Sequence, residues 1–257
     1  YRDSFTLIKM IDDFGFNTHV TSNGYIINDS IAKKIAESDL ENIGISLDGF
    51  NSQTHDYLRG RSNSSTRTMN AIRYLRSASS KLIIGIITII MEKNKDEIIP
   101  LVQWVQENKD LDYINFQAIM QPFGEKFGAD WYRKDINKEL WPQDIDKICG
   151  ILDSLIKLKG NGFPKIGNPI SQLETFKKYF KAPENIIRRN PICSSIDYGI
   201  RINYYGGIHL CQSYNLIGDI FHDFRETYYS IGAQDVRRQI ISCKKNCHML
   251  VNCMQED

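Results

Sequence analysis

The chain has 257 residues, which is enough for one barrel-sized α/β domain or a domain with a small appendage. Its 32 basic and 31 acidic residues leave a formal charge of +1 without a basic stripe, which argues against nucleic acid as the main partner. The most apolar run, residues 82–91, is far shorter than the roughly 20 residues of a membrane helix, and no signal peptide opens the sequence. We expect a cytoplasmic protein without a membrane partner.

Strand-like and helical patterns alternate over the first 120 residues. Strands are predicted over 18–22, 42–47, 82–91 and 113–119, and helices over 4–14, 30–37, 66–77 and 95–108. This alternation predicts βα units and a parallel sheet. Residues 82–91 show no polar face, which predicts a strand covered on both sides. The helical pattern starts almost at Tyr1, so we expect further residues of the protein to precede it.

A segment rich in proline, glycine and tryptophan, residues 122–142, follows the last predicted strand. It fits either a substrate lid or an ordinary packed connection. Helices are then predicted over 143–157 and 171–180. Cys149 lies on the first of these among apolar residues, which predicts a small buried side chain.

Most of the cysteines fall in the last 65 residues, and these late cysteines are Cys193, Cys211, Cys243, Cys247 and Cys253. Disulfides need an oxidising compartment and usually an even number of partners, and neither condition is met. Zinc commonly uses two close pairs, whereas here only Cys243 and Cys247 are closely spaced. An iron–sulfur cluster also takes four thiolates, with freer spacing. Iron–sulfur, zinc and free thiols remain open at this point, with iron–sulfur favoured.

A β-hairpin is predicted between the first two late cysteines. Apolar residues alternate with polar ones up to Tyr204, Gly206-Gly207 turns the chain, and the second strand leads to Cys211. A helix over 233–241 ends just before Cys243. The predicted hairpin would therefore end at Cys211, and the predicted helix would end just before Cys243.

Polar motifs follow two of the predicted strands. Thr21-Ser-Asn23-Gly24 closes the first, Ile45-Ser46-Leu-Asp48-Gly49 closes the second, and His55-Asp56-x-x-Arg59-Gly60 lies in the loop beyond. The carboxyl ends of the strands are the edge where βα barrels place their sites. Each motif alone is also ordinary turn chemistry.

In this order, and followed by the cysteine module, the motifs resemble the radical S-adenosylmethionine (SAM) superfamily, in particular members with a carboxy-terminal SPASM or Twitch extension. The resemblance implies an α/β fold: a partial (β/α)6 TIM-like barrel with a small cysteine-rich hairpin and helix domain. It divides the chain into barrel strands three to six at 1–140, a helical connection at 141–190 and a Twitch-like auxiliary domain at 191–257.

The resemblance also implies site residues. Ser46 and Asp48 would contact the SAM ribose and its neighbourhood, and Ser22 and Asn23 would lie near the methionyl group. The strand backbone at Phe116, Gln117 and Ala118 would contact adenine, and Arg59 is a candidate for SAM or substrate, or a structural arginine. No catalytic side chain is assigned.

Twitch holds one auxiliary [4Fe–4S] cluster, and the five late cysteines are too few for the two clusters of a full SPASM domain. Cys193 and Cys211 are the expected ligands, joined by two of Cys243, Cys247 and Cys253, with the first two favoured. The Cys-x3-Cys-x2-Cys motif of the SAM-cleaving cluster and the Gly-Gly-Glu motif do not occur in the sequence. We expect both upstream of Tyr1.

The function implied by the resemblance is a radical SAM enzyme. It would generate a 5′-deoxyadenosyl radical to modify a peptide or a small molecule, with electrons from a reductase or flavodoxin-type donor. One alternative is a non-catalytic barrel relative whose metal-bound cysteine module binds a partner protein. Another is a zinc-stabilised protein unrelated to SAM.

Overall fold

The structure is a computed structural model of the chain, and it describes residues 3–122, 128, 130–184, 193–196, 199–243, 247 and 249–253. The chain divides into two compact units, residues 1–181 and 182–256. Helices α7 (Ile145–Gly160) and α8 (Ile170–Lys181), which follow the aromatic segment 122–142, belong to the first unit.

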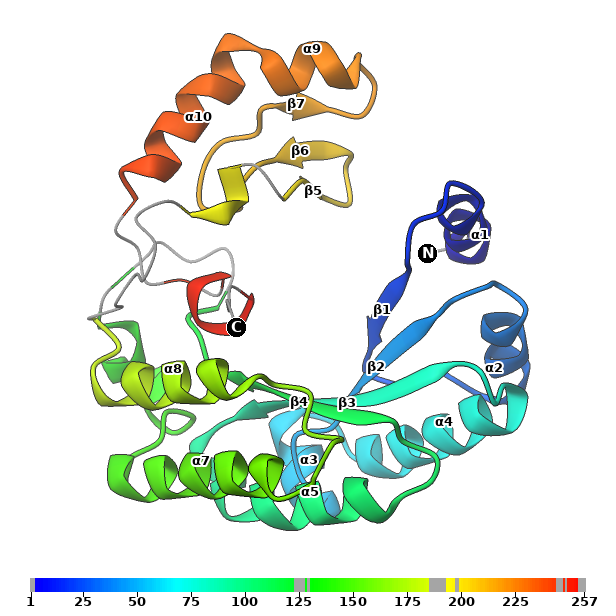
Figure 1. Cartoon of the computed structure of the whole chain (residues 1–257), viewed down its shortest axis with the longest axis vertical. Helices are drawn as coiled ribbons and strands as arrows, with labels where there is room; N and C mark the ends of the chain where they lie inside the picture. Colours follow the sequence, from blue (N-terminus) through cyan, green and yellow to red (C-terminus); the bar gives the residue numbers. More distant parts are fainter. Residues whose placement is uncertain are drawn as a thin grey trace. The chain divides into compact units, whose positions relative to one another are not determined.

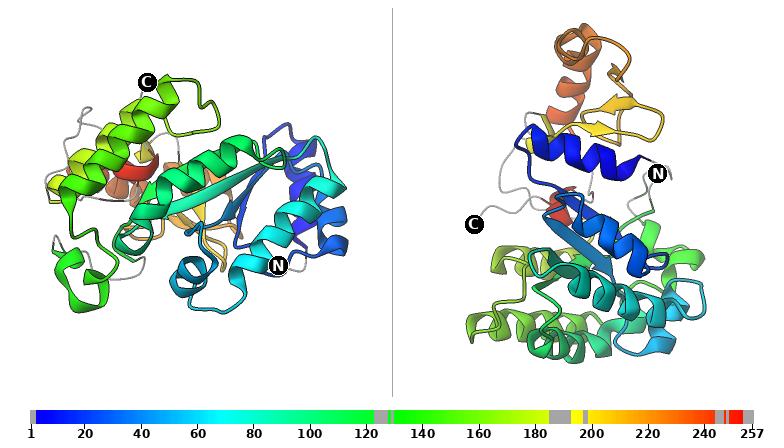
Figure 2. Two further views of the ribbon diagram at one scale, coloured as in Figure 1. Left: turned by 90° about the horizontal axis from the view of Figure 1, so that it is seen from below. Right: turned by 90° about the vertical axis from the view of Figure 1, so that its right-hand side faces the viewer.

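A parallel sheet forms the centre of the first unit, in the order β1-β2-β3-β4. Its strands are His19–Ser22, Asn42–Ser46, Ile83–Ile90 and Tyr113–Ala118. Helices α2 (Asp29–Ala36), α4 (Ser64–Ala78) and α5 (Ile98–Glu107) cover one face (Figures 1 and 2). The predicted α/β class, strands and parallel pairing are confirmed. In the described part of the chain β1 pairs only with β2, so closure into a barrel stays a prediction.

The two faces of the sheet differ in burial. The side chains toward the helices, such as Ile45, Ile86 and Phe116, are at most 1% exposed. The opposite face carries polar and half-buried side chains, and Ile83 on it is 44% exposed. We call this second face, with Asn42, Ser46, Tyr113 and Gln117, the open face. The prediction that residues 82–91 are covered on both sides is wrong for the described residues, because alternate isoleucines of β3 point to the open face.

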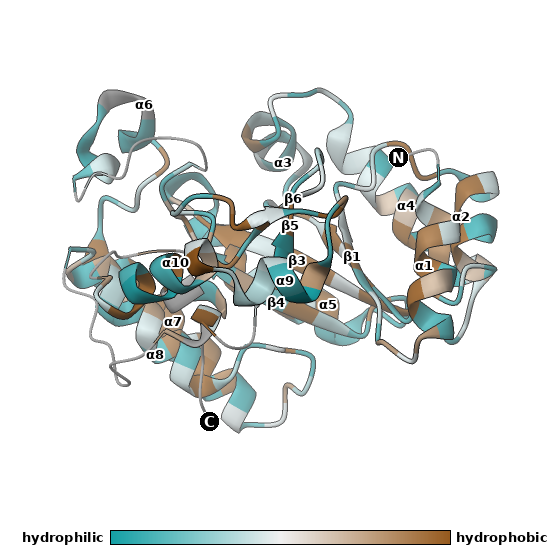
Figure 3. Cartoon of the chain, turned by 90° about the horizontal axis from the view of Figure 1, so that it is seen from above, coloured by the Kyte–Doolittle hydropathy of each residue, from teal (hydrophilic) through white to brown (hydrophobic). Residues whose placement is uncertain are grey.

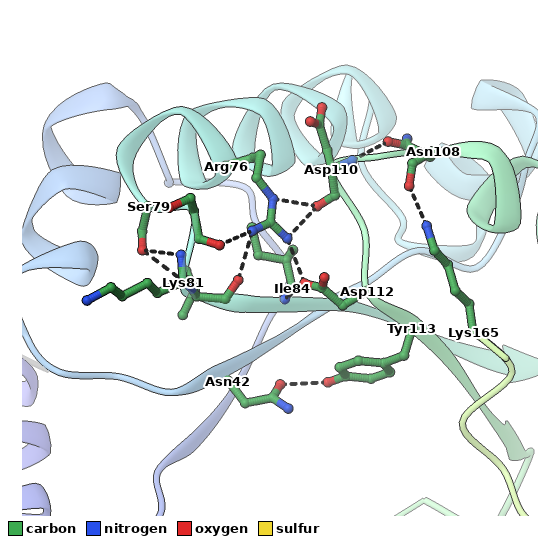
Figure 4. A network of polar contacts seen from close by, with 12 residues as sticks. Asn42, Arg76, Ser79, Lys81, Ile84, Asn108, Asp110, Asp112, Tyr113 and Lys165 are labelled. Carbon is green, nitrogen blue, oxygen red and sulfur yellow. Dashed lines mark hydrogen bonds and ion pairs between the residues drawn. The ribbon is translucent and has the colours of Figure 1, made fainter.

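The amino ends of the strands are fixed by Arg76 on α4 (Figure 4). Its guanidinium donates to the carbonyls of Ser80, Leu82 and Asp110, and it lies 2.6 Å from the Asp112 carboxylate. Asp112 also accepts a hydrogen bond from the Ile84 amide. This partly buried arginine therefore joins the helix to the starts of β3 and β4, at the edge away from the predicted site.

A glycine of β3 allows an aromatic ring to lie on the open face. Gly44 of β2 pairs with Gly85 of β3, and a Cβ at Gly85 would stand 2.1 Å from the ring of Tyr113. The Tyr113 hydroxyl donates to Asn42 Oδ1 at 2.8 Å (Figure 4). The space that a side chain at Gly85 would occupy is thus filled by the Tyr113 ring, which bridges β4 to β2.

The predicted helices are present with small changes in their bounds. They are α1 (Ser4–Asp13), α2, α4, α5 preceded by a 3-10 turn at Glu92–Glu97, α7 (Ile145–Gly160), α8 (Ile170–Lys181) and α10 (Ile231–Ile241). The sequence prediction missed α3 (Ser52–Leu58) and α9 (Phe224–Tyr229). Both are short, and their formation depends on capping by Asn51 and Asp223. Cys149 of α7 is buried, as predicted.

Aromatic packing anchors the described part of the segment after β4. Trp131 and Trp141 are 4% and 6% exposed, and their rings meet edge to face with centroids 5.7 Å apart. Trp141 also packs on Tyr179 and Phe180 of α8. Between these anchors lie a 3-10 turn, Trp131–Arg133, and α6, Asp135–Lys138. These contacts favour a packed connection over a lid; Gly124 and its neighbours lie outside the described residues.

The second unit contains a small antiparallel sheet, β5 (Arg201–Ile202), β6 (Gly207–His209) and β7 (Gly218–Asp219). The predicted hairpin and its glycine turn are confirmed. Gly206 has a φ of +85°, which suits glycine, and the Asn203 side chain accepts from the amides of Tyr205 and Gly207. The third strand was not predicted, because two residues give no alternation to detect.

Helix α1 contains several apolar residues, which are brown in Figure 3. Leu7, Met10 and Phe14 are 54%, 52% and 76% exposed, and no residue of the helix is buried. Across the described residues, no helix combines the length and apolar character needed to span a membrane.

Candidate functional site

The first predicted motif forms a tight turn where β1 ends. The Ser22 hydroxyl accepts from the Gly24 amide at 3.1 Å, and the Asn23 side chain accepts from the Tyr25 amide at 3.0 Å. Gly24 has a φ of +71°, and a Cβ there would meet Ala71 at 3.3 Å. The turn therefore needs glycine, and it leaves the Asn23 side chain exposed at the edge of the sheet.

The second motif ends the neighbouring strand at the same edge. Ser22 pairs with Ile45 in the parallel sheet. Asn23 and Ser46, the next residues on the two neighbouring segments, therefore lie at the same edge of the sheet. The Ser46 side chain belongs to the half-buried open face, and its hydroxyl makes no hydrogen bond to a described residue. The Asn-Gly and Asp-Gly turns thus lie on one edge, as the barrel interpretation requires.

Asp48 is almost fully buried, with 3% of its surface exposed. One carboxylate oxygen accepts from the Ile89 amide at 2.9 Å, and the other lies 2.6 Å from Nη2 of Arg59. Burial raises the pKa of this carboxyl, while the Arg59 charge and the Ile89 amide oppose the shift. Both oxygens are therefore engaged within the protein. Asp48 orients Arg59, and its direct contact with a cofactor stays a prediction.

Arg59 follows α3 directly and reaches back to the strand edge. Its side chain is about one quarter exposed, at 26%, and its Nε is buried without a hydrogen-bond partner among the described residues. A guanidinium carries five N–H donors, so one ion pair leaves donors for a ligand. The buried Nε of Arg59 lacks a hydrogen-bond acceptor among the described residues.

Two further side chains hold this loop: Asn94, which the sequence analysis did not single out, and His55, which it named only as part of the third motif. Asn94 donates to the carbonyls of Asp48 and Ile89 and accepts from the Met91 amide. His55 is fully buried, its Nδ1 accepts from the Asp48 amide, and its Nε2 lies 3.3 Å from the Ser64 hydroxyl. Burial lowers the pKa of His55 to about 4, so the ring is neutral. Both residues stabilise the backbone that presents Asp48.

The backbone of β4 has fewer groups available to contact adenine than the sequence predicts. The Asn168 side chain accepts from the Phe116 amide at 2.6 Å and donates to the Phe116 carbonyl at 2.9 Å. Phe116 is 1% exposed and faces the helices, whereas Gln117 belongs to the open face. The backbone groups of Phe116 are thus taken by a segment that continues the sheet edge. Of the three predicted adenine contacts, Gln117 lies on the open face, whereas Phe116 and Ala118 are buried on the opposite face. All three contacts stay predictions.

The late cysteines lie in the second unit, and none forms a disulfide. Cys193 is buried in a small core with Leu210, Val236 and Ile240, and Cys211 packs against the same core. Cys243 comes directly after α10, whose Ile240 carbonyl accepts from the Cys243 amide. Cys253 is exposed at the end of a short turn, 249–253, whose Val251 amide donates to the Cys247 carbonyl.

The described residues do not assemble a metal site. In that part of the chain no three histidine, cysteine, aspartate or glutamate side chains lie close enough together to hold an ion. The donor chemistry suits an iron–sulfur cluster, and Cys193 and Cys211 share a core, but the four-thiolate arrangement stays a prediction. We therefore assign no step of the chemistry to these cysteines.

A comparison with protein-family models bears on the family. The model of the radical SAM superfamily matches residues 1–105 of the 257, which contain the three polar motifs. The match covers less than half of the chain.

Proteins similar to this chain include an AdoMet-dependent heme synthase from Methanosarcina barkeri. It is 27% identical over 146 residues, which are 57% of this chain and 38% of the relative. The fold is similar to SuiB of Streptococcus suis bound to S-adenosylmethionine, with a TM-score of 0.62, 16% identity and coverage of 91% of this chain and 53% of SuiB. SuiB bound to precursor peptide SuiA gives a TM-score of 0.59 at 17% identity, covering 91% of this chain and 52% of SuiB. The chain spans about half the length, or less, of these relatives.

The residues at the carboxyl edge of β1 and β2 can be compared with the chemistry of SAM. SAM carries a carboxylate, which suits a guanidinium with unused donors such as Arg59. It also carries ribose hydroxyls, which suit a hydroxyl without a protein partner such as that of Ser46. The buried, unpartnered Nε of Arg59 supports this fit from within the structure.

Proposed function

We propose that the complete protein is a radical SAM enzyme and that the carboxyl edge of β1 and β2 holds SAM. When bound beside a reduced [4Fe–4S] cluster, SAM supplies a 5′-deoxyadenosyl radical that abstracts a hydrogen atom from the substrate. The Cys-x3-Cys-x2-Cys motif for that cluster does not occur among these 257 residues, so we propose that another part of the protein provides it. The observation that carries the proposal is the pairing of Arg59 with Asp48 at this edge, with donors to spare.

The residues of this chain orient the cofactor in this proposal. Arg59, held by Asp48, binds the SAM carboxylate. The Ser46 hydroxyl contacts the ribose, and Asn23 lies near the methionyl group. The helices that cover the other face keep water from the back of the sheet, while the open face receives the substrate.

We propose a peptide as the substrate class. The solved complex of SuiB with its precursor peptide supports this choice, because that protein shares the fold of this chain. A second candidate, a heme precursor, is favoured by the higher identity to the heme synthase. Fold alone does not choose between them. Electrons would come from a reductase or flavodoxin-type protein.

We further propose that the second unit holds one auxiliary [4Fe–4S] cluster. The ligands would be Cys193 and Cys211 with two of Cys243, Cys247 and Cys253. The shared core of the first two and the absence of any disulfide support this proposal. The competing function, a non-catalytic module that binds a partner protein, predicts no turnover of SAM.

The experiment uses the full-length protein, reconstituted anaerobically with iron and sulfide and supplied with SAM and dithionite. The proposal predicts 5′-deoxyadenosine, detected by mass spectrometry. A candidate precursor peptide encoded beside the gene and a heme precursor are then added separately. The true substrate class increases 5′-deoxyadenosine and gains a mass change. No 5′-deoxyadenosine under any of these conditions would overturn the enzyme assignment.

A further inference from the structure

A polar groove lies in the first unit beside the proposed SAM edge. It has a volume of about 430 Å³ and opens between the loop after β1 and the start of α4. Its lining residues are Tyr25, Ile26, Ile27, Asn28, Asn63, Thr66, Arg67, Asn70 and Tyr74. Nothing in the SAM mechanism above uses this groove.

Two arginines converge on one aromatic ring of the groove. The guanidinium carbon of Arg61 lies 3.6 Å from the centroid of the Tyr25 ring, and that of Arg67 lies 4.4 Å from the same centroid. Neither arginine has a carboxylate within 4.0 Å among the described residues. Stacking on tyrosine offsets only part of the repulsion between two such cations. The groove therefore carries positive charge that no described acid neutralises.

The acidic side chains near the groove already have partners outside it. Asp56 accepts from the amides of Asn63 and Ser65 with its two carboxylate oxygens, and Asp29 pairs with Lys33 at 2.7 Å. The ligand that complements the groove must therefore bring its own negative charge.

The remaining lining suits a polypeptide. Asn28 uses its side-chain oxygen to cap α2, and Asn70 uses its own to accept from Arg73, so both keep amide N–H donors. No hydrogen bond holds the side chain of Asn63 within the described structure. Amide groups of this kind pair with peptide carbonyls, whereas the stacked guanidinium groups are preorganised for carboxylates.

The groove is connected directly to the SAM edge. Tyr25 lies two residues after Asn23, and the Thr68 hydroxyl, next to Arg67 in sequence, donates to the Asn23 carbonyl at 3.1 Å. A chain held on Tyr25 and Arg67 could thus continue toward the open face.

We propose that this groove binds an acidic segment of the peptide substrate, away from the residue that is modified. The proposal rests on the peptide class proposed above. It names Arg61 and Arg67 as the residues that bind the carboxylates, and Tyr25 as the ring that positions both.

The test measures binding without turnover. Fluorescein-labelled decapeptides of equal length, one with four glutamates and one with four lysines in their place, are titrated into the full-length holoenzyme and followed by anisotropy. We expect the glutamate peptide to bind more tightly. The double variant R61Q/R67Q should weaken it by roughly tenfold or more, the scale of a lost charge-assisted hydrogen bond. R61K/R67K should recover part of the loss.

The matched control is K34Q/K81Q, which removes two exposed charges from the same unit outside the groove. It should leave the affinity for the glutamate peptide unchanged. Equal binding of the two peptides, or equal loss in both double variants, would overturn the proposal. So would displacement of the glutamate peptide by inorganic phosphate at equal concentration, which would identify a phosphate site.

Formation of 5′-deoxyadenosine without peptide separates this proposal from the function of the protein. R61Q/R67Q should retain it, because neither residue contacts SAM in our account. If the wild-type protein forms none, the enzyme assignment fails whatever the peptides do. If it forms 5′-deoxyadenosine and still does not discriminate the peptides, only the groove proposal fails.

Discussion

Nη2 of Arg59 lies 2.6 Å from Oδ2 of Asp48, although the two residues are eleven positions apart in sequence with helix α3 between them. The carboxylate is buried, and the arginine is the charge that compensates it. This pair fixes the loop after β2 and sets the position of the guanidinium at the strand edge. Removing either partner therefore affects both stability and ligand binding.

Asp48→Asn should lower the free energy of unfolding by about 2–4 kcal/mol, because it leaves the partly buried Arg59 without its counter-charge. Urea unfolding of the full-length protein measures this loss. Asp29→Asn removes an exposed carboxylate paired with Lys33, and it should cost below about 1 kcal/mol. Equal losses in the two variants would contradict the role given to the buried pair.

His55 should make the protein less stable as the pH falls. Its pKa is about 4 in the folded chain, against an ordinary value of 6.5, because burial disfavours the charged ring. The unfolded state thus binds the proton first, and stability declines between about pH 6.5 and pH 4. From pH 7 to pH 5 this contribution is about 2 kcal/mol.

The variant His55→Gln removes the imidazole that takes up this proton, so it should flatten this part of the pH dependence. Urea unfolding at pH 7 and at pH 5 measures the change. His19→Gln, at an exposed histidine of the same unit, serves as the control and should keep the wild-type slope. An unchanged slope in His55→Gln would show that another group produces it.

Gly85→Ala should destabilise the sheet by about 1–3 kcal/mol, because the added methyl group would stand 2.1 Å from the Tyr113 ring. Combining it with Tyr113→Leu should relieve part of the clash, so the two effects should not add. Gly150→Ala on α7 is the matched control, since nothing lies within 4 Å of its Cβ position, and it should stabilise by about 0.5–1 kcal/mol. Thermal unfolding of the four variants tests this set, and additive losses would contradict the contact.

Cys193→Ser and Cys211→Ser should each lower the iron content of the reconstituted full-length protein by up to about four atoms per chain. Cys149→Ser should not, because that thiol is buried in α7 among apolar residues. Iron and sulfide analysis measures the change. Zinc in place of iron, or an equal iron content in all three variants, would contradict the proposal of an auxiliary iron–sulfur cluster.

Sequence reasoning recovered the strands because each is a short apolar or alternating stretch that separates helical patterns and is bounded by polar residues. It recovered the shared edge of the Asn-Gly and Asp-Gly motifs because parallel strands end on the same side. It could not find Asn94 or Asn168, since the Asp48 carbonyl and the Phe116 backbone that they bind lie 46 and 52 positions away in sequence. It also missed α3, so Arg59 was placed in a loop although it follows a helix that aims it at Asp48.

The most direct test of the central claim is the affinity for SAM, measured by equilibrium dialysis on the reconstituted full-length protein. Arg59→Gln should weaken binding by roughly tenfold or more, because it removes a charge-assisted contact with the carboxylate. Arg73→Gln, on the exposed surface of α4, should bind SAM as the wild type does. Circular dichroism confirms that both variants are folded. Unchanged affinity in folded Arg59→Gln would contradict the assignment of SAM to this edge.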